Sequence, residues 1–329
     1  MIFLELLPDE ALDSFCSRNL VYSQRWNNSA FFRKLDFDFS SKWSKKKIEN
    51  LAIELGFSRE YGYNFLLHYH TNYFRHAFVE GYLDNTYGVG RFGGSLIIEA
   101  SATREVKICP HCISEDILEH GFIYWKRSHQ VFDIKVCSKH NLKLTSSCSR
   151  CSKPFYLKRH FFELPWSSCE CGLSIFDLDR KANDNLAELS LAAFISGLYE
   201  YRFRLEYGGV VNLIKNRLAT LGLNSIDEVC DKYCTSMDEV HFNVVAWNIN
   251  EILKGRDCYV WGLPYVLAAL FESFDSFAET VAKENVRRVI VDAHWHVQCW
   301  KSAVAPRSAP FHSARQHTNM KTKFYRVYE

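Results

Sequence analysis

The chain has 329 residues, of which 47% are hydrophobic, and a formal net charge of only +2. This length is enough for two or three domains with ordinary cores. The near-neutral charge excludes a protein that binds nucleic acid through an overall basic field, so any such binding must come from local patches. No apolar run reaches membrane-spanning length, and the first residues lack the basic segment of a secretory signal. We therefore expect a cytoplasmic protein in a reducing compartment, without a membrane partner.

Residues 1–80 predict a helical domain with a helix-turn-helix unit. Polar capping residues and a glycine alternate with short apolar stripes, which is typical of short helices joined by tight turns. Ser44 and Ser58 are the clearest predicted N-caps. The expected helices span residues 8–20, 30–35, 45–55 and 59–74.

Two features of this first domain suggest contacts with partners. Lys45, Lys46 and Lys47 fall on the first turn of a predicted helix, where three positive charges oppose the helix dipole. They predict an anionic partner such as nucleic acid, although a solvated helix face explains them equally well. The domain is also rich in aromatic residues, which predicts either a docking surface or a core against the C-terminal half. These are Phe31, Phe32, Trp43, Phe57, Tyr61, Tyr63, Tyr69 and Tyr73.

Residues 81–107 form a predicted connector rich in glycine, and residues 108–180 carry a dense set of cysteines. Seven cysteines and one histidine fall into four short pairs, separated by 24, 7 and 17 residues. Each pair puts two ligands at one tight turn, so that both can point at one metal ion. The pairs are Cys109/Cys112, Cys137/His140, Cys148/Cys151 and Cys169/Cys171.

The four pairs predict two structural zinc ions per chain. Thiolate sulfur and imidazole nitrogen are ligands that Zn²⁺ prefers, and eight ligands complete two tetrahedra with no open position for water or substrate. The sequential grouping places the first two pairs on one ion and the last two on the other. An interleaved grouping stays open, but the seven-residue link between the second and third pairs favours adjacent sites.

Two rival explanations of the cysteines are weaker. Disulfides would require a secreted chain. A nucleophilic pair of Cys137 and His140 is conceivable, but residues three apart in a turn suit a shared metal better. The other cysteines (Cys16, Cys230, Cys234, Cys258 and Cys299) are expected to be free thiols.

Residues 181–300 predict a C-terminal helical domain, again with a helix-turn-helix rhythm. Asn185 is a predicted N-cap, and Gly208-Gly209 and Gly222 are predicted helix ends. The expected helices span residues 186–207, 210–221, 226–234, 242–253, 263–274 and 277–300. The last would carry Arg287 and Arg288, a second candidate contact for nucleic acid or a partner.

Residues 301–329 form a predicted basic tail. Six cations (Lys301, Arg307, Arg315, Lys321, Lys323 and Arg326) stand against Glu329, a net charge of +5 that leaves −3 for the rest of the chain. An anionic partner or a disordered solubilising tail would each explain this asymmetry.

The chain resembles the TniQ/TnsD family of transposition target-selection proteins, most closely the TniQ of CRISPR-associated transposons. The opening residues 7–15 are similar to the family's P-x-E-S-L-x-S-W/F start. The stretch 109–116 (CPHCISED) is close to its C-P-x-C-L-x-E-D motif. Trp125, Arg127 and His129 precede residues 137–144 (CSKHNLKL), which match C-x-x-H-x-x-x-L. The resemblance covers residues 1 to about 180.

The resemblance implies a bacterial, non-catalytic adaptor for RNA-guided DNA integration. Family members connect a target recogniser to the AAA+ regulator TnsC. Some sit as a head-to-tail homodimer on a CRISPR Cascade complex, whose guide RNA reads the sequence. Others, like TnsD, read an attachment site in DNA directly. The length and near-neutral charge favour the Cascade-bound form, because a direct reader needs many phosphate contacts.

An enzyme is the third reading, and the sequence supports it least. There is no HExxH motif and no open zinc site. The pairs His68/His70 and His294/His296 could hold a metal on a strand, but both occur where helices are predicted and residues i and i+2 diverge.

Overall fold

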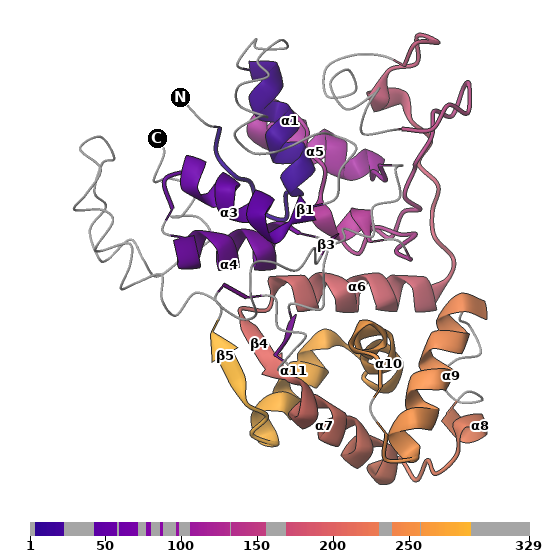
Figure 1. The fold of residues 1–329 in the computed structure, drawn as a ribbon. Coiled ribbons are helices and arrows are strands. Elements are labelled where there is room, and N and C mark those ends of the chain that lie inside the picture. The colour runs from indigo at the N-terminus through magenta and orange to yellow at the C-terminus, as the bar shows by residue number, and fades with distance from the viewer. Residues whose placement is uncertain are drawn as a thin grey trace.

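The computed structural model describes residues 4–22, 43–57, 59–71, 77–79, 86–87, 97–98, 106–131, 133–155, 169–229, 239–256 and 258–290. The prediction of a mainly helical protein is confirmed. Two lobes lie on either side of α6 (Leu186–Glu200), as Figure 1 shows. Within the described segments, no helix combines the length and hydropathy needed to cross a membrane.

The described residues of the N-terminal lobe form α1 (Leu12–Tyr22), α3 (Lys45–Glu54), α4 (Arg59–His70) and α5 (Pro110–His120). Ser44 caps α3 as predicted, accepting a hydrogen bond from the backbone N–H of Lys47. β1 (Trp43–Ser44) pairs with β3 (Ile97–Ile98) in an antiparallel ribbon. Two 3₁₀ turns, η3 (Arg127–Gln130) and η4 (Ile175–Asp177), belong to the cysteine-rich region.

The aromatic residues of the N-terminal lobe form its own core. Trp43, Tyr61 and Tyr63 are buried beside Leu51 and Leu66, in a cluster against which Phe57 and Tyr69 pack. For the rings that the structure describes, the expectation of an exposed docking surface is therefore wrong. Phe31, Phe32 and Tyr73 lie outside the described residues.

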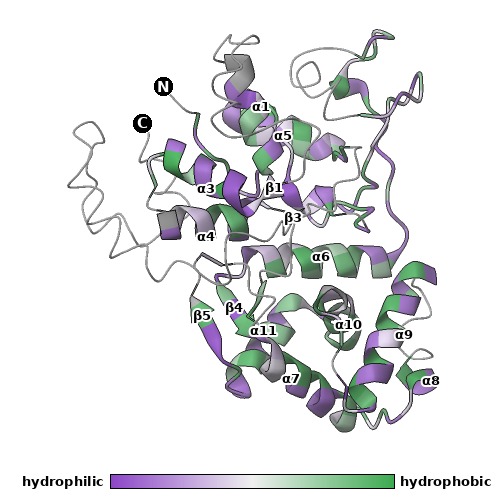
Figure 2. Ribbon diagram, in the orientation of Figure 1, coloured by the Kyte–Doolittle hydropathy of each residue, from purple (hydrophilic) through white to green (hydrophobic). Residues whose placement is uncertain are grey.

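The C-terminal lobe packs helices around α10, whose sequence is almost entirely apolar (Figure 2). Its core draws buried side chains from every helix of the lobe. The helices are α7 (Tyr207–Thr220), α8 (Ile226–Val229), α9 (Glu239–Leu253), α10 (Leu263–Leu270) and α11 (Phe274–Lys283), with the 3₁₀ turn η6 (Val260–Gly262) before α10.

A three-stranded sheet closes the C-terminal lobe, in the order β2 (Phe78–Val79), β4 (Phe203–Glu206) and β5 (Arg288–Ile290). β2 runs parallel to β4, and β5 antiparallel to it. Their partners are distant in the sequence, so no local pattern predicts this sheet.

The sheet explains two wrong helix predictions. The helix expected over residues 186–207 ends at Glu200, because the chain turns extended at Tyr201 to form β4. Gly208 and Gly209 do not end a helix but lie in the first turn of α7. A Cβ atom on Gly209 would lie 2.9 Å from Val286, so the glycine permits close packing there.

The helices near both ends of the described chain are also shorter than predicted. α1 begins at Leu12 instead of residue 8, because Asp9 adopts a left-handed conformation with φ of 57°. The helix expected over 277–300 ends at Lys283, and Asn285 with φ of 53° turns the chain into β5. The helix expected over residues 263–274 ends early, at Leu270, and Ser273 caps the separate helix α11.

Two apolar clusters join segments that were predicted as separate domains. Ala77 and Phe78 pack within the core of the C-terminal lobe. Val131, Ile134 and Val136 of the cysteine-rich region pack against one face of α6. The cysteine-rich region is therefore attached to the C-terminal lobe by shared packing.

Candidate metal centres

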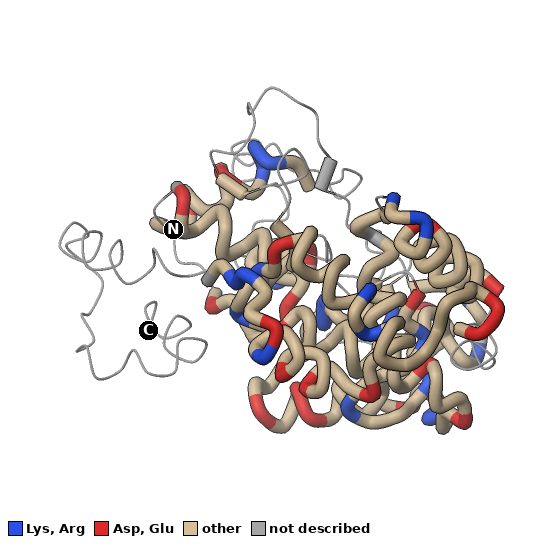
Figure 3. Tube along the Cα trace, turned by 90° about the horizontal axis from the view of Figure 1, so that it is seen from below, with Lys and Arg blue, Asp and Glu red and all other residues tan. Residues whose placement is uncertain are grey.

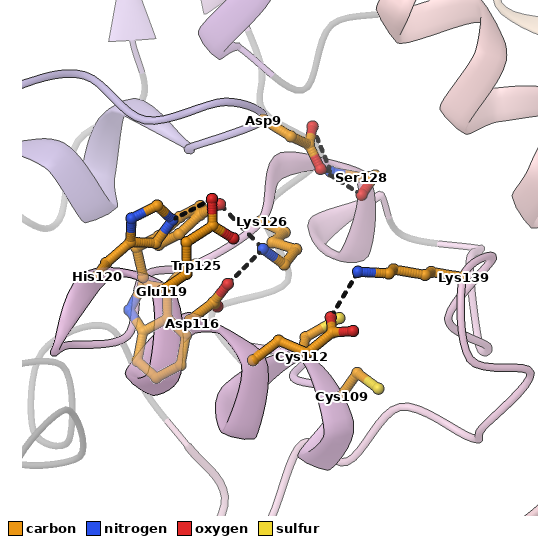
Figure 4. A network of polar contacts seen from close by, with 12 residues as sticks. Asp9, Cys109, Cys112, Asp116, Glu119, His120, Trp125, Lys126, Ser128 and Lys139 are labelled. Atoms are coloured by element: carbon orange, nitrogen blue, oxygen red, sulfur yellow. Dashed lines mark hydrogen bonds and ion pairs between the residues drawn. The ribbon is translucent and has the colours of Figure 1, made fainter. Parts of the chain in front are cut away.

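The first cluster is formed by Cys109, Cys112, Cys137 and His140, whose ligand atoms all lie within 4.8 Å of one another. Cys109 is the N-cap residue of α5, and Pro110 occupies the first helical position, which suits its fixed φ. Cys112 follows one turn later, so both sulfurs lie at the helix start (Figure 4).

The distances within the first cluster match a zinc tetrahedron. The Nδ1 atom of His140 lies 3.5, 3.4 and 3.6 Å from the sulfurs of Cys109, Cys112 and Cys137. The sulfurs of Cys112 and Cys137 are 3.7 Å apart. Zinc bonds of about 2.3 Å to sulfur and about 2.05 Å to nitrogen would place these atoms about 3.5 Å (S to N) and about 3.8 Å (S to S) apart.

Glu115, on the next turn of α5, holds the imidazole of His140 in position. Its carboxylate lies 3.2 Å from His140 Nε2 and 2.7 Å from Lys139 Nζ. The Lys139 ammonium, with a further contribution from His140, lowers the pKa of Glu115. An ionised Glu115 accepts a hydrogen bond from Nε2–H, which fixes the proton on Nε2 and leaves Nδ1 free to bind a metal.

Glu115 was not singled out by the sequence analysis. The spacing of Glu115 could have indicated its role, because it stands three residues after Cys112 and therefore on the same face of the helix. The partner, His140, could not be assigned to it without the fold.

The second cluster is formed by Cys148, Cys151, Cys169 and Cys171. The sulfurs of Cys148 and Cys171 are 3.5 Å apart, as are those of Cys151 and Cys169. Both pairs lie on short turns instead of helices. The structure thus gathers the eight residues in the sequential grouping, and the interleaved grouping is wrong.

The backbone around the second cluster favours thiolate ligands. Burial opposes ionisation of Cys148, but the backbone N–H groups of Cys151 and Arg150 donate to its sulfur and lower its pKa to about 7. Burial raises the pKa of Cys169 to about 12. A metal that binds all four sulfurs must therefore displace protons, so its affinity depends on pH.

Neither cluster contains a disulfide. The nine cysteines that the structure describes are free thiols, and sulfur atoms 3.5 Å apart are too distant for a disulfide bond of about 2.05 Å. Sets of soft sulfur donors with one imidazole fit Zn²⁺ and no hard cation.

A buried arginine connects the cysteine-rich region to both lobes. Arg127 is 2% exposed, and it is the largest fully buried side chain among the described residues. Its guanidinium donates to the carbonyls of His68 and Thr71 at the end of α4, and to the carbonyl of Tyr199 on α6 at 3.1 Å. It also lies over the Tyr199 ring, 4.0 Å from its centroid.

Asp9 supplies the opposite charge for Arg127. Its Oδ1 atom lies 3.3 Å from Arg127 Nε, and Ser128 Oγ donates to Oδ2 at 2.5 Å (Figure 4). Beside it, Lys126 Nζ lies 2.8 Å from Asp116 on α5. The short segment 126–128 therefore holds α4, α5, α6 and the turn before α1 together.

The residues predicted to contact nucleic acid or a partner differ in their solvent exposure. Lys45 and Lys47 are buried, at 6% and 8% exposed, which leaves Lys46 as the exposed lysine of that turn. Arg287 and Arg288 are exposed, but Arg288 lies in a strand instead of a helix.

The remaining predicted residues have these positions. His68 and His70 are buried on α4 and contact the carbonyls of Tyr201 and Glu10 at 2.9 and 2.8 Å, as core residues do. The tail residues Lys301, Arg307, Arg315, Lys321, Lys323, Arg326 and Glu329 lie outside the described residues, as do Cys230, Cys234, Cys299, His294 and His296.

Comparison with known proteins yields one finding. Residues 1–144 match the family model TniQ, a span that ends just after the first cluster and includes all four of its ligands. No curated protein matches the chain.

Proposed function

We propose, from the membership in the TniQ family that residues 1–144 establish, that this transposition-associated chain is a non-catalytic target-selection adaptor. In this role it links a target-recognition complex, of the guide-RNA Cascade type, to a TnsC-type AAA+ regulator. Its working form is a head-to-tail homodimer. The observation that carries the proposal is the match over residues 1–144, because it contains the complete first cluster.

Two structural zinc ions are part of the proposal. The residues would hold them as two closed sets of four ligands, which supplies folding energy and leaves no position for a substrate. Among the described residues, no other group of three or more metal-binding side chains comes together. This supports a scaffold for protein contacts instead of a catalytic metal site.

The charge distribution supports an adaptor over a direct DNA reader. Figure 3 shows Lys and Arg positions interleaved with Asp and Glu positions along the described backbone. Lysines of the cysteine-rich region face carboxylates: Lys139 lies 2.7 Å from Glu115, and Lys143 lies 3.4 Å from Asp184. A direct reader of duplex DNA needs many uncompensated phosphate contacts. In this proposal the helical pairs α3–α4 and α7–α9 are helix-turn-helix units used for protein contact.

Co-purification tests the adaptor role. The tagged full chain is expressed together with a Cascade complex and an AAA+ regulator, and the eluate is examined for both and for guide RNA. We expect all three in stoichiometric amounts, resistant to deoxyribonuclease. The purified chain alone is then tested by gel shift. Tight, sequence-dependent binding to an attachment site without partners would instead establish the TnsD-like reader.

A further inference from the structure

Arg288 begins β5, the outer strand of the sheet in the C-terminal lobe, and Arg287 directly precedes it; β5 lies at the left of that lobe in Figure 1. Both side chains are exposed, and within the described part of the chain neither forms an ion pair. Glu206, at the end of the neighbouring strand β4, is joined to Arg287 through the backbone, where its N–H donates to the Arg287 carbonyl at 3.0 Å.

The positive charges of Arg287 and Arg288 have no carboxylate partner, whereas the lysines of the cysteine-rich region do. Each of five lysines there has a carboxylate within ion-pair distance: Lys126, Lys135, Lys139, Lys143 and Lys153. The two arginines therefore expose positive charge that folding does not use. Uncompensated charge on a rigid element points to an anionic partner.

An aromatic ring orients one of the two guanidinium groups. Arg288 lies over Phe203 of β4, with its guanidinium carbon 5.3 Å from the ring centroid. Arg202 lies over the same ring at 6.0 Å and is also exposed. A guanidinium stacked on a ring keeps its N–H edges available for bidentate bonds to phosphate oxygens.

The sequence beyond β5 adds positive charge of the same kind. Residues 301–329 carry a net charge of +5, and they follow ten residues after the strand ends at Ile290. The exposed arginines and this tail are thus neighbours along the chain.

We propose that Arg287 and Arg288, with Phe203 and Arg202 beside them, form a binding surface for the phosphate backbone of nucleic acid, without sequence preference. The proposal rests on the proposed function in one respect: the adaptor's partners would bring nucleic acid close to this surface. A planar guanidinium matches the paired oxygens of a phosphodiester. Because neighbouring residues of an extended chain point to opposite faces, a phosphate backbone that runs along the sheet edge would meet Arg288 on one face and Arg287 on the other. An acidic protein is the alternative partner, and the test must distinguish it from nucleic acid.

The test measures binding of the purified full chain to a fluorescein-labelled duplex of arbitrary sequence by anisotropy, over a series of salt concentrations. The variant is Arg287→Gln/Arg288→Gln. The control is Lys254→Gln/Arg256→Gln, just after the end of α9, which removes the same charge from exposed positions, one of which (Arg256) has a carboxylate partner in Glu251 at 3.5 Å. Thermal unfolding verifies that both variants fold.

We expect the wild-type affinity to fall steeply with salt, as it does for sequence-independent binding. Loss of two phosphate contacts should weaken binding about tenfold near 0.1 M salt and flatten the slope of log K against log salt by about 2. The control should change neither value. A second duplex of unrelated sequence should bind equally well.

Three results would overturn the proposal. These are an equal effect of the control variant, an unchanged salt slope in the arginine variant, and displacement of the duplex by an acidic polypeptide at equal charge concentration. None of them bears on co-purification with Cascade, so failure of this surface and failure of the adaptor role are distinguishable.

Discussion

The first cluster takes two ligands from the first turn of α5 and buries all three of its sulfurs, whereas the second takes its ligands from two short turns and leaves Cys151 and Cys171 partly exposed. The two clusters also differ in the chain segment that lies between their ligand pairs. Between Cys112 and Cys137 lies the segment that carries Trp125 and Arg127, which contact both lobes. Of the segment that the second cluster encloses, the structure describes residues 152–155; Phe155 packs with Ile113 and Trp125 in the core of the cysteine-rich region, and none of these four residues hydrogen-bonds to α4 or α6. We infer that two closed four-ligand sets, one of three cysteines and a histidine and the other of four cysteines, differ in what they stabilise, depending on the segment that each one closes.

The largest effect is expected from breaking the first cluster. Cys112→Ser should remove one zinc and release the segment that carries Arg127. Structural zinc contributes about 10–16 kcal/mol in small zinc domains, comparable to the whole stability of a protein. We therefore expect loss of soluble protein, measured as yield and as cooperative thermal unfolding. Cys16→Ala is the control, because Cys16 is equally buried but lies outside both clusters. A soluble Cys112→Ser protein with unchanged unfolding would contradict this account.

Removal of the buried guanidinium should come next. Arg127→Met deletes the hydrogen bonds to α4 and α6 and removes the cation beside Asp9, whose carboxylate keeps only the hydrogen bonds from Ser128. Breaking one side of a buried ion pair costs about 3–5 kcal/mol. Denaturant unfolding measures the loss, and Arg180→Met, at an exposed position, is the matched control. A cost for Arg127→Met no larger than that of the control would show that the segment 126–128 does not join the lobes.

Breaking the second cluster should have a local effect. Cys151→Ser should remove the second zinc and lower the midpoint of unfolding, yet leave the packing around α4 and α6 intact. Amide hydrogen exchange reads this directly, because protection should fall within residues 145–180 and persist in α4 and α6. Loss of protection throughout the chain would show that the second cluster stabilises the whole molecule, as the first is expected to do.

The smallest effect is expected from the residue that orients His140. Glu115→Gln keeps a hydrogen-bond acceptor but removes the negative charge beside the imidazole, and such changes lower metal affinity about 10- to 100-fold. Competition with a chromophoric chelator measures the affinity of the first site. Glu119→Gln on the same helix is the control. If both variants bind zinc as tightly as the wild type does, Glu115 does not position the ligand.

The sequence predicted what depends on neighbouring residues. Ser44 and Asn185 cap α3 and α6 as expected, because an N-cap bonds only to the next turn. The four ligand pairs were equally local, and their short connecting segment favoured the observed grouping.

The sequence could not predict what depends on distant partners. β4 forms because β2 and β5 pair with it, from positions far before and after it in the chain. Arg127 bonds to residues 59 and 72 positions away, so its role was visible only once α4 and α6 were placed. The aromatic rings of the first lobe were ambiguous because composition does not reveal which rings share a core.

Native mass spectrometry of the purified chain tests the central claim, that metal at the first cluster holds the molecule together. The account predicts two zinc ions per wild-type chain and one in Cys151→Ser. It further predicts that chelation of that single remaining ion unfolds the variant, seen as a shift to high charge states. A compact, metal-free chain in the same spectrum would contradict it.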